Sequence, residues 1–254
     1  MMSLPVLLSI PHGGMDVPIE LLGRVCLERA DLFDDSDAYS REIYDLGERV
    51  AAVISTGIAR AFIDLNRAPD DLPAQNPDGV VKSHTCYGKA IYCKDAQPDE
   101  NLVKRLLDKY YFSYHRRIKN ILSGDDPLPE LALDCHSMAA VGPAISPDKG
   151  KKRPMICLGD VRGTSCPRGK TEQLAACMRE AFSLRENEVT INRPFAGGYI
   201  TRTYGGRPLP WIQVEMNRSL YLRKPFFDRD TLSVNENRLR ELGGQFEKAL
   251  RLYF

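Results

Sequence analysis

Residues 4–14 read LPVLLSIPHGG, an apolar run followed by a proline, a histidine and two glycines. A short apolar run that ends at a proline is typical of a buried strand. The stretch therefore predicts a strand over 5–10 that places the imidazole of His12 at its carboxyl end. The two glycines carry no side chain, so they leave room beside the imidazole for a ligand and let backbone amides approach it.

The composition is that of an ordinary globular protein, since 43% of the 254 residues are hydrophobic and 27% are charged. A chain of this length can bury one hydrophobic core, and we expect a single domain over 1–254. The 35 basic residues nearly balance the 34 acidic ones, which gives a net charge of +1. The overall field therefore favours neither nucleic acid nor an anionic membrane as a partner, and any site for an anion must be local.

The cysteines and the first residues both predict a cytoplasmic protein. Seven cysteines are an odd number, and none of them forms a C-x-x-C pair. This pattern indicates reduced thiols in a chain large enough to fold without disulfides. The apolar run at 4–10 contains a proline, follows no Lys or Arg, and is too short to cross a bilayer. We expect it to be a strand and neither a signal peptide nor a membrane anchor.

Short apolar runs alternate with longer helical patterns along the chain. This alternation predicts an α/β fold in which helices cover a mixed, mostly parallel sheet. The expected strands cover residues 5–10, 59–65, 131–135, 154–158, 188–192 and 211–216. The expected helices cover residues 37–52, 99–122, 171–184 and 230–252. Proline and glycine cluster at 68–79 and 141–150, where we expect two long loops that serve a function.

Polar side chains stand at the ends of three expected strands, where hydrophobic packing does not explain them. They are His12 after the first strand, D-L-N-R at 64–67 in the second and D-C-H-S at 134–137 in the third. Because the carboxyl ends of strands in an open α/β sheet face a common crevice, these groups can converge in space. Two histidines and several carboxylates brought together indicate a metal site.

Histidine is scarce, with four in the chain, and His12 and His136 take equivalent places at strand ends. Two imidazoles and one carboxylate, with a fourth position open to water, commonly hold catalytic zinc. The acidic stretch D-D-S-D at 34–37 supplies the carboxylate, with Asp37 as the first choice and Asp34 as the reserve. The alternative for these acids is the first turn of a helix capped by Ser36.

Two other strand residues bear on the chemistry. Asp134 lies two residues before His136, on the same face of a strand, where it can orient that imidazole. In the strand over 211–216, alternation places Gln213 and Glu215 on one face. Glu215, flanked by apolar neighbours, is a candidate general base with a raised pKa, and pairing with an arginine is the alternative.

The segment GGYITRTYGG at 197–206 is bracketed by glycines and rich in hydrogen-bond donors. Its backbone amides, the Thr201 hydroxyl and the Arg202 guanidinium can together hold a carboxylate. A β-hairpin with ordinary polar faces is the alternative. The segment is thus a candidate for binding an acidic substrate.

These pieces together resemble the N-formylglutamate amidohydrolase family. The matching segments follow the family's order over nearly the whole chain: P-H-G-G at 11–14, S-D at 36–37, D-L-N-R at 64–67, D-C-H-S at 134–137, G-G-Y at 197–199 and E-M-N-R at 215–218. The resemblance implies a phosphorylase/hydrolase-like fold and one zinc ion per chain. It also implies a distant similarity to zinc carboxypeptidases and to aspartoacylase.

The resemblance further implies roles for particular residues. It assigns the metal to His12, Asp37 and His136, the base to Glu215, and substrate binding to Asn66 and Arg67, because aspartoacylase holds its substrate with a D-L-N-R segment. The segment at 112–115 lacks the proline that the family usually has before its Tyr-His pair. His115 therefore either reaches the site as a catalytic residue or packs on a helix, and His84 receives no role.

The predicted reaction is zinc-dependent hydrolysis of an N-formyl amino acid such as N-formylglutamate, in which Glu215 moves the proton. Arg67 would stabilise the oxyanion or bind a substrate carboxylate, and Arg202 would bind the distal carboxylate. A carboxypeptidase-like or other N-acyl-amino-acid hydrolase with the same metal site is one alternative. A non-catalytic protein that binds an acidic metabolite is another, although a binder needs no base. The expected partner is a small acidic molecule, and the oligomeric state is left open.

Overall fold

The computed structural model describes residues 3–73, 75–124, 127–144 and 146–254. Within these ranges the chain forms two compact units. The first unit draws on 1–10, 39–53 and 127–254, and the second draws on 11–38 and 54–126. The chain thus enters the second unit directly after Ile10 and returns to the first directly before Tyr39. The single domain expected over 1–254 stays a prediction.

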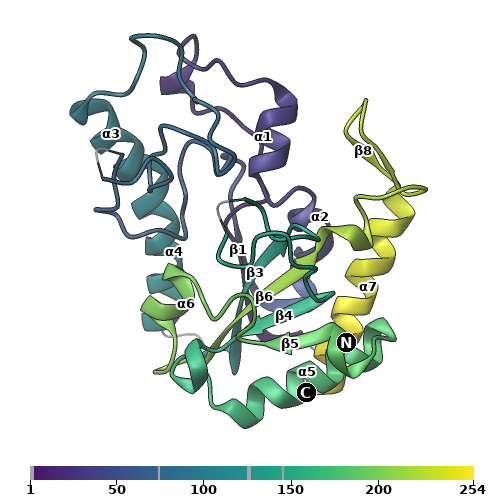
Figure 1. Ribbon diagram of the computed structural model, residues 1–254. Helices are drawn as coiled ribbons and strands as arrows, with labels where there is room; N and C mark the ends of the chain where they lie inside the picture. Colours follow the sequence, from purple (N-terminus) through teal and green to yellow (C-terminus); the bar gives the residue numbers. More distant parts are fainter. Residues whose placement is uncertain (1–2, 74, 125–126, 145) are drawn as a thin grey trace. The chain divides into compact units, whose positions relative to one another are not determined.

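A six-stranded sheet forms the middle of the first unit (Figure 1). Its strands are β1 (Leu4–Ile10), β2 (Val50–Ser55), β3 (Leu131–Met138), β4 (Ile156–Gly159), β5 (Val189–Ile191) and β6 (Trp211–Asn217). They lie in the order β2-β1-β3-β6-β4-β5. β3 runs parallel to β1 and β6, whereas β4 runs parallel to β5 and antiparallel to β6. This mixed, mostly parallel sheet confirms the predicted α/β fold.

Alternation along the strands gives the sheet one apolar face and one polar face. On the apolar face, aliphatic side chains of β1, β3 and β6 join a buried core with the helices α2 (Ser40–Tyr44), α5 (Arg168–Phe182) and α7 (Glu236–Tyr253). Figure 1 shows α5 and α7 against the sheet, and the two helices pack on each other. The opposite face carries buried polar side chains, namely Ser9, Asp134, His136, Gln213 and Glu215. The short helix α6 (Tyr199–Tyr204) contacts β6.

The second unit has little regular structure. Its helices are η1 (Ile19–Leu21), α1 (Arg29–Asp35) and α3 (Glu100–Leu106), which continues through a π-helical turn, η3 (Leu107–Tyr111), into α4 (Phe112–Ser123). Between residues 56 and 99, the described part of the chain forms turns and isolated bridges. One of these bridges pairs Tyr92 with Val25 from earlier in the same unit. The loop expected at 68–79 lies in this part.

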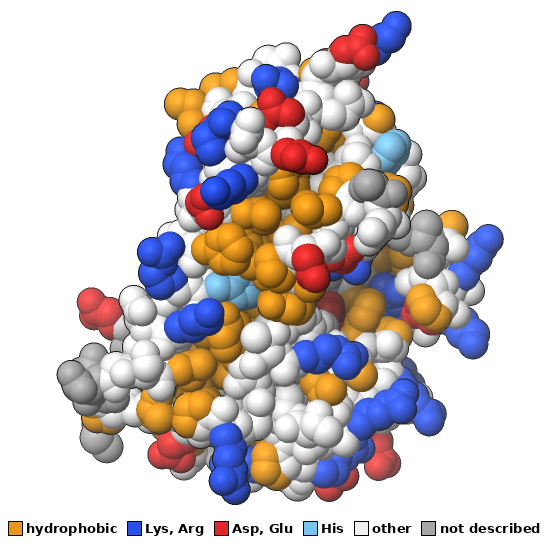
Figure 2. Space-filling view, turned by 90° about the vertical axis from the view of Figure 1, so that its left-hand side faces the viewer, with side chains coloured by type: hydrophobic (Ala, Val, Ile, Leu, Met, Phe, Trp, Pro, Cys, Tyr) orange, Lys and Arg blue, Asp and Glu red, His pale blue; other side chains and the backbone are white. Residues whose placement is uncertain are grey.

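Short elements complete the chain: η2 (Gly47–Arg49), η4 (Val161–Gly163), η5 (Glu186–Glu188), η6 (Arg218–Leu220), β7 (Phe227–Asp228) and β8 (Ser233–Val234). None of the helices in the described ranges has the length and the apolar character that crossing a membrane requires. Charged side chains of both signs are interspersed on the face shown in Figure 2, in agreement with the net charge of +1.

Five of the six expected strands are present, as β1, β3, β4, β5 and β6. The strand expected over 59–65 is wrong, because this segment forms turns in which the N–H of Phe62 donates to the carbonyl of Ala59 at 3.0 Å. Its apolar side chains are nevertheless buried. A short apolar run indicates burial but does not by itself identify the backbone conformation. The segment is buried as the pattern predicts, but its backbone forms turns.

The expected helices are present with shifted ends, except for the one over 37–52. That helix ends at Tyr44, and the chain passes through Gly47, with φ of 55°, into β2, which the sequence pattern did not predict. The helix expected over 230–252 begins at Glu236, after the β7–β8 hairpin. The capping hypothesis for Ser36 is also wrong, because this residue ends α1 and its hydroxyl donates to the Phe33 carbonyl.

The expectation of seven reduced thiols is wrong for one pair. A disulfide joins Cys26 to Cys93, whose Cα atoms lie 5.1 Å apart. The antiparallel bridge between Val25 and Tyr92 brings these two segments together. The cysteines are 67 residues apart in sequence, and no short spacing signals such a pairing. The free cysteines are Cys86, Cys135, Cys157, Cys166 and Cys177.

Candidate active site

His12 follows β1 closely, and its side chain is 5% exposed. Its Nε2 lies 2.8 Å from Oδ1 of Asp64, and its Nδ1 lies 3.5 Å from Oδ2 of Asp37. The backbone N–H of Asp37 also donates to the carbonyl of His12 at 3.0 Å. Because an ionised carboxylate can only accept, Asp64 favours the tautomer with its proton on Nε2. The lone pair of Nδ1 is then directed toward Asp37, where a cation can lie.

Asp64 is held as an anion by its neighbours. Nε of Arg60 donates to Oδ2 at 2.9 Å, and the backbone N–H of Asn66 donates to Oδ1 at 2.9 Å. Burial opposes the charge on this carboxyl group, but Arg60, together with His12 and Lys82, outweighs burial and holds the pKa of Asp64 well below its usual range. Asp64 is therefore a strong acceptor for the His12 N–H at neutral pH.

A buried ion network surrounds Asp64. Lys82 is fully buried, and its Nζ lies 2.7 Å from Oδ1 of Asp78 and 3.1 Å from Oδ2 of Asp35. Burial raises the pKa of the Asp35 carboxyl group, but Lys82 and Arg60 reverse this effect and lower it below its usual value. Nη2 of Arg67 donates to Oδ2 of Asp78 at 2.8 Å. The charges of Lys82 and Arg67 are thus balanced by carboxylates within the network.

His136 lies on β3 with a carboxylate partner of its own. Its Nε2 lies 3.1 Å from Oδ1 of Asp134, two residues earlier on the same strand face. The hydroxyl of Thr201 donates to Oδ2 of Asp134 at 3.1 Å, and the hydroxyl of Ser9 donates to Oδ1 at 3.4 Å. The hydroxyl of Tyr44 donates to the carbonyl of His136 at 3.1 Å. Both the side chain and the backbone of His136 are therefore fixed.

Glu215 is the register partner of His136 on the adjacent parallel strand β6. Its side chain is buried, and Oε1 accepts a hydrogen bond from Nε2 of Gln213 at 2.7 Å. The amide oxygen of Gln213 accepts in turn from the backbone N–H of Gly198. On the other side, Cys157 of β4 pairs with Glu215 in register. Burial and the charge of Glu215 raise the pKa of Cys157 to about 11, so this thiol stays protonated.

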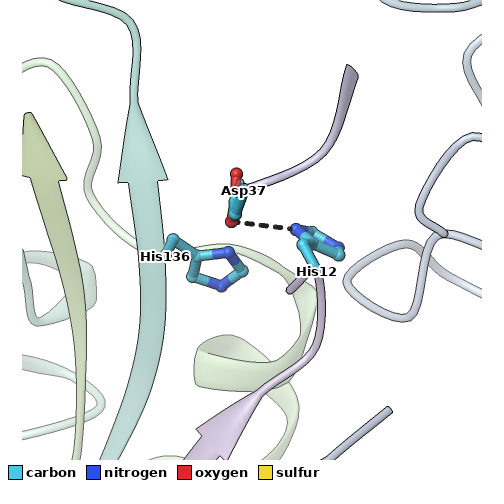
Figure 3. Close-up of side chains that lie close together, drawn as sticks. All are labelled: His12, Asp37 and His136. Carbon is cyan, nitrogen blue, oxygen red and sulfur yellow. Dashed lines mark ion pairs between the residues drawn. The ribbon is translucent and has the colours of Figure 1, made fainter. Parts of the chain in front are cut away.

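His12, Asp37 and His136 form a group that can hold a metal ion (Figure 3). Each offers one ligand atom, these atoms lie within 4.8 Å of one another, and all three residues are buried. Figure 3 shows the three side chains pointing toward one another, with the His12–Asp37 ion pair drawn. Two imidazole nitrogens and one carboxylate oxygen are the donors that catalytic zinc sites use. Asp37, rather than Asp34, belongs to this group.

Other residues predicted for the site make contacts that hold neighbouring segments together. Nε2 of His115 lies 3.0 Å from the carbonyl oxygen of Leu65, and its ring stacks on Tyr111 with centroids 4.2 Å apart. Asn66 contributes its backbone N–H to Asp64, and His84 is exposed, beside the hydroxyl of Ser83.

The segment at 197–206 forms the helix α6, so the hairpin alternative is wrong. Thr201 is buried, and its hydroxyl is used by Asp134. Arg202 is exposed, and its Nε donates to the carbonyl of Gly197 at 2.9 Å. The segment therefore places one predicted substrate-binding residue against the sheet and the other at the surface.

Sequence reasoning missed two contacts, that of Asp64 with His12 and that of Gln213 with Glu215. Asp64 was recognised as part of a D-L-N-R segment, but its contact with His12 joins residues 52 positions apart. Gln213 was assigned to the same strand face as Glu215, and that alternation was the available signal for their contact. The arginine Arg60, which neutralises Asp64, had no sequence signal, because a lone arginine four residues before an aspartate is common on any surface.

Comparison with known families agrees with this geometry. The model of a family described as N-formylglutamate amidohydrolase matches residues 4–222. The chain belongs to the N-formylglutamate amidohydrolase family. The matched range includes the metal-binding group, Asp64, Asp134 and Glu215. The Pseudomonas putida and Ralstonia eutropha relatives described below are named as hydrolases that act on amides, and the predicted family resemblance is confirmed.

Individual relatives cover most of the chain. An N-formylglutamate deformylase from Pseudomonas putida is 29% identical over 242 residues, which are 91% of this chain and 87% of the relative. The crystal structure of an N-formylglutamate amidohydrolase from Ralstonia eutropha JMP134 covers 100% of this chain and 94% of its own, with 23% identity and a TM-score of 0.79. A gene product from Agrobacterium tumefaciens has 16% identity and a TM-score of 0.60, over 98% of this chain and 90% of its own. These two structures establish a shared fold.

Proposed function

We propose that the protein hydrolyses the amide bond of N-formylglutamate, releasing formate and glutamate, with one zinc ion bound per chain. The observation that carries the proposal is the buried group of His12, Asp37 and His136, with the carboxylate of Glu215 in register beside His136. The family supports the reaction class. The Pseudomonas putida relative, named as an N-formylglutamate deformylase, supports the substrate.

The donor set fits zinc. Each of the two imidazoles has its Nε2 against a carboxylate, Asp64 for His12 and Asp134 for His136. This arrangement fixes the ring and leaves Nδ1 as the ligand atom. When bound, zinc supplies a Lewis acid that polarises the substrate carbonyl and makes water acidic enough, with a pKa of about 7, to react at neutral pH.

Glu215 is the proposed base. Gln213 donates to Oε1 of this carboxylate and orients it. The carboxylate takes a proton from the attacking water as the water oxygen bonds to the formyl carbon, and then gives that proton to the amide nitrogen as the C–N bond breaks. Formate and the free amine are the products. Glu215 is 7% exposed, so bulk water competes little for this proton.

Arg67, Asn66 and Arg202 are the proposed substrate-binding residues. Arg202 is anchored through Nε to the carbonyl of Gly197, and its two Nη groups have the geometry for a bidentate contact with a carboxylate. Arg67 shares its charge with Asp78, so it suits a polarised carbonyl oxygen better than a second full negative charge. His115 holds the carbonyl of Leu65, and we assign it to positioning the D-L-N-R segment.

A cytoplasmic location remains part of the proposal. It is supported by the five free cysteines and by the chemistry of the substrate, a small metabolite. The disulfide between Cys26 and Cys93 weighs in the other direction, because stable disulfides are uncommon in that compartment.

Metal analysis of the purified protein, combined with a substrate panel, tests the proposal. The panel contains N-formylglutamate, N-formylglutamine, N-acetylglutamate and a dipeptide with a free carboxyl terminus, and formate and free amino acid are both quantified. We expect zinc at about one ion per chain and formate release from N-formylglutamate. Cleavage of the dipeptide without deformylation would favour the carboxypeptidase-like alternative. Tight binding of N-formylglutamate without turnover would favour a binding protein.

A further inference from the structure

The helix α6 makes two polar contacts with the polar face of the sheet. At its start, the backbone N–H of Gly198 donates to the amide oxygen of Gln213. Within the helix, the hydroxyl of Thr201 donates to Oδ2 of Asp134 at 3.1 Å. Asp134 on β3 and Gln213 on β6 are register partners. The two contacts of α6 therefore fall on one row of side chains that crosses two strands.

The next row along the same face contains the residues assigned to the chemistry. His136 lies two residues after Asp134, Glu215 lies two residues after Gln213, and His136 and Glu215 are themselves register partners. Each member of the first row bonds its neighbour in the second, because Asp134 Oδ1 lies 3.1 Å from Nε2 of His136 and Gln213 Nε2 donates to Glu215 at 2.7 Å. Two parallel branches thus lead from α6 to a candidate metal ligand and to the candidate base.

From this arrangement we propose that Thr201 and Gln213 are positioning residues: Thr201 orients the metal ligand His136 through Asp134, and Gln213 orients the base Glu215. The inference rests on the function proposed above. It changes the role of Thr201, which the sequence pattern assigned to substrate binding.

The Gln213 branch has a fixed direction. Because the amide oxygen of Gln213 accepts from Gly198, its NH2 group must be the end that faces Glu215. Gln213 and Glu215 are 4% and 7% exposed, so water does not readily replace this donor. A hydrogen bond to a buried carboxylate constrains the plane of the carboxylate and therefore the direction of its lone pairs.

The Thr201 branch completes the coordination of Asp134. This carboxylate is fully buried, with Thr201 on Oδ2 and with Ser9 and His136 on Oδ1. Removal of the Thr201 hydroxyl leaves Oδ2 of a buried anion without this donor, and the carboxylate turns away from His136 to recover one. The imidazole then loses the partner that fixes its tautomer.

The position of α6 is set by close backbone packing just before it. The N–H of Val161 donates to the carbonyl of Ala196 at 2.7 Å. Gly159 of β4 has no side chain where a Cβ would lie 2.7 Å from the carbonyl carbon of Ala196. This contact holds the chain against the end of β4, so that Gly198 reaches Gln213.

Paired substitutions separate positioning from packing. Thr201→Val keeps the shape and loses the hydroxyl, Thr201→Ser keeps the hydroxyl, and Thr203→Val alters an exposed residue of the same helix. Gln213→Met keeps the length and loses the N–H donor, and Gln173→Met on the exposed side of α5 is its control. Thermal unfolding of every variant identifies any that fails to fold.

We expect the two branches to give different signatures. Thr201→Val weakens zinc binding by about 10–100-fold in competition with a chelator, without substrate present, and Thr201→Ser restores it. Gln213→Met lowers kcat about tenfold or more while KM and zinc content stay near those of the parent. Thr203→Val and Gln173→Met change neither quantity.

Parent-like zinc affinity in Thr201→Val, or parent-like kcat in Gln213→Met, would overturn the corresponding branch and leave that residue a packing role. Failure of the proposed function is a separate result. It appears as absence of formate release by the parent protein, whereas the zinc competition with Thr201→Val needs no turnover.

Discussion

Nε2 of His12 lies 2.8 Å from Oδ1 of Asp64, and a second imidazole repeats this relationship. Nε2 of His136 lies 3.1 Å from Oδ1 of Asp134. The two carboxylates are stabilised by different means, since Arg60 neutralises Asp64 whereas hydroxyl groups of Thr201 and Ser9 solvate Asp134. Both histidines are consequently presented through Nδ1. This shared geometry orients both imidazoles of the candidate metal-binding group.

The first prediction concerns Asp64. Asp64→Asn keeps the shape but removes the charge, so the His12 N–H loses its charged acceptor and Arg60 loses its ionic partner. We expect zinc affinity to fall by about 10–100-fold, measured by chelator competition. Asp71→Asn is the matched control, because Asp71 pairs with Arg67 and Asn76. An unchanged zinc affinity in Asp64→Asn would mean that Asp64 serves only to pair with Arg60.

The second prediction concerns the metal ligands. His136→Ala removes one of the three donors, and the two that remain bind zinc too weakly for catalysis. We expect metal content and formate release to be lost together, as followed by metal analysis and by a formate assay on the same preparations. Stoichiometric zinc with full activity in this variant would show that the ion lies elsewhere.

The third prediction separates the base from the ligands. Glu215→Gln preserves the size of the side chain but cannot take a proton, so kcat should fall by about 100-fold or more. Zinc content should remain that of the parent, because Glu215 is outside the metal-binding group. Loss of zinc in this variant would instead make Glu215 a ligand and put the role of Asp37 in question.

The fourth prediction concerns the stability of the buried ion network. Lys82 has 0% of its side chain exposed and pairs with the buried Asp35 and with Asp78, which Arg67 also contacts. Lys82→Met therefore leaves the buried Asp35 carboxylate without this cation. We expect the free energy of unfolding to fall by about 3–5 kcal/mol in urea titrations of the metal-free protein.

Lys89→Met is the control for this measurement. Lys89 has 49% of its side chain exposed and pairs with Asp31 at 2.6 Å. Water and salt screen such a pair, so its removal should lower the free energy of unfolding much less than the removal of Lys82 does. Equal losses in the two variants would mean that burial does not distinguish the network from a surface ion pair.

The sequence predicted the parts of the site that lie on regular strands. The apolar run before His12 and the alternation in the strand of Glu215 fix which side chains reach the polar face, because register and side-chain alternation are local consequences of strand geometry. The same rule predicts that Asp134 lies beside His136, and the contact between their side chains confirms this prediction. The disposition of these residues could thus be derived without knowing the rest of the chain.

Features that depend on distant contacts could not be predicted in this way. The pattern predicts a strand end at Asp64, but this residue lies in a segment without regular structure. Its contact with His12 depends on how that segment folds. The helix α6 was missed because a glycine-bracketed hexapeptide has too few residues to show a helical period. The Cys26–Cys93 disulfide likewise depends on a long-range meeting of two loops.

The fifth prediction concerns the substrate and follows from local charge. A net charge of +1 gives no long-range selection of acidic molecules, so a preference for glutamate must come from short-range pairing with arginine. Nε of Arg202 is already held by the carbonyl of Gly197, which reduces the entropy lost when the Nη groups bind a carboxylate.

We therefore expect kcat/KM for N-formylglutamate to exceed that for N-formylglutamine by about 10–100-fold, the value of one charge-assisted pair. Arg202→Ala should shrink this ratio without changing zinc content, and Arg202→Lys should restore it in part, because an ammonium group cannot make two parallel hydrogen bonds. Arg251→Ala on α7, which packs on the apolar face of the sheet, should leave the ratio as it is.

Equal rates for both substrates in the parent would contradict the assignment of glutamate and point to a broader set of N-formyl amino acids. The ratio in Arg202→Ala tests separately whether this arginine binds the distal carboxylate of the substrate. A ratio equal to that of the parent would show that another residue makes this contact.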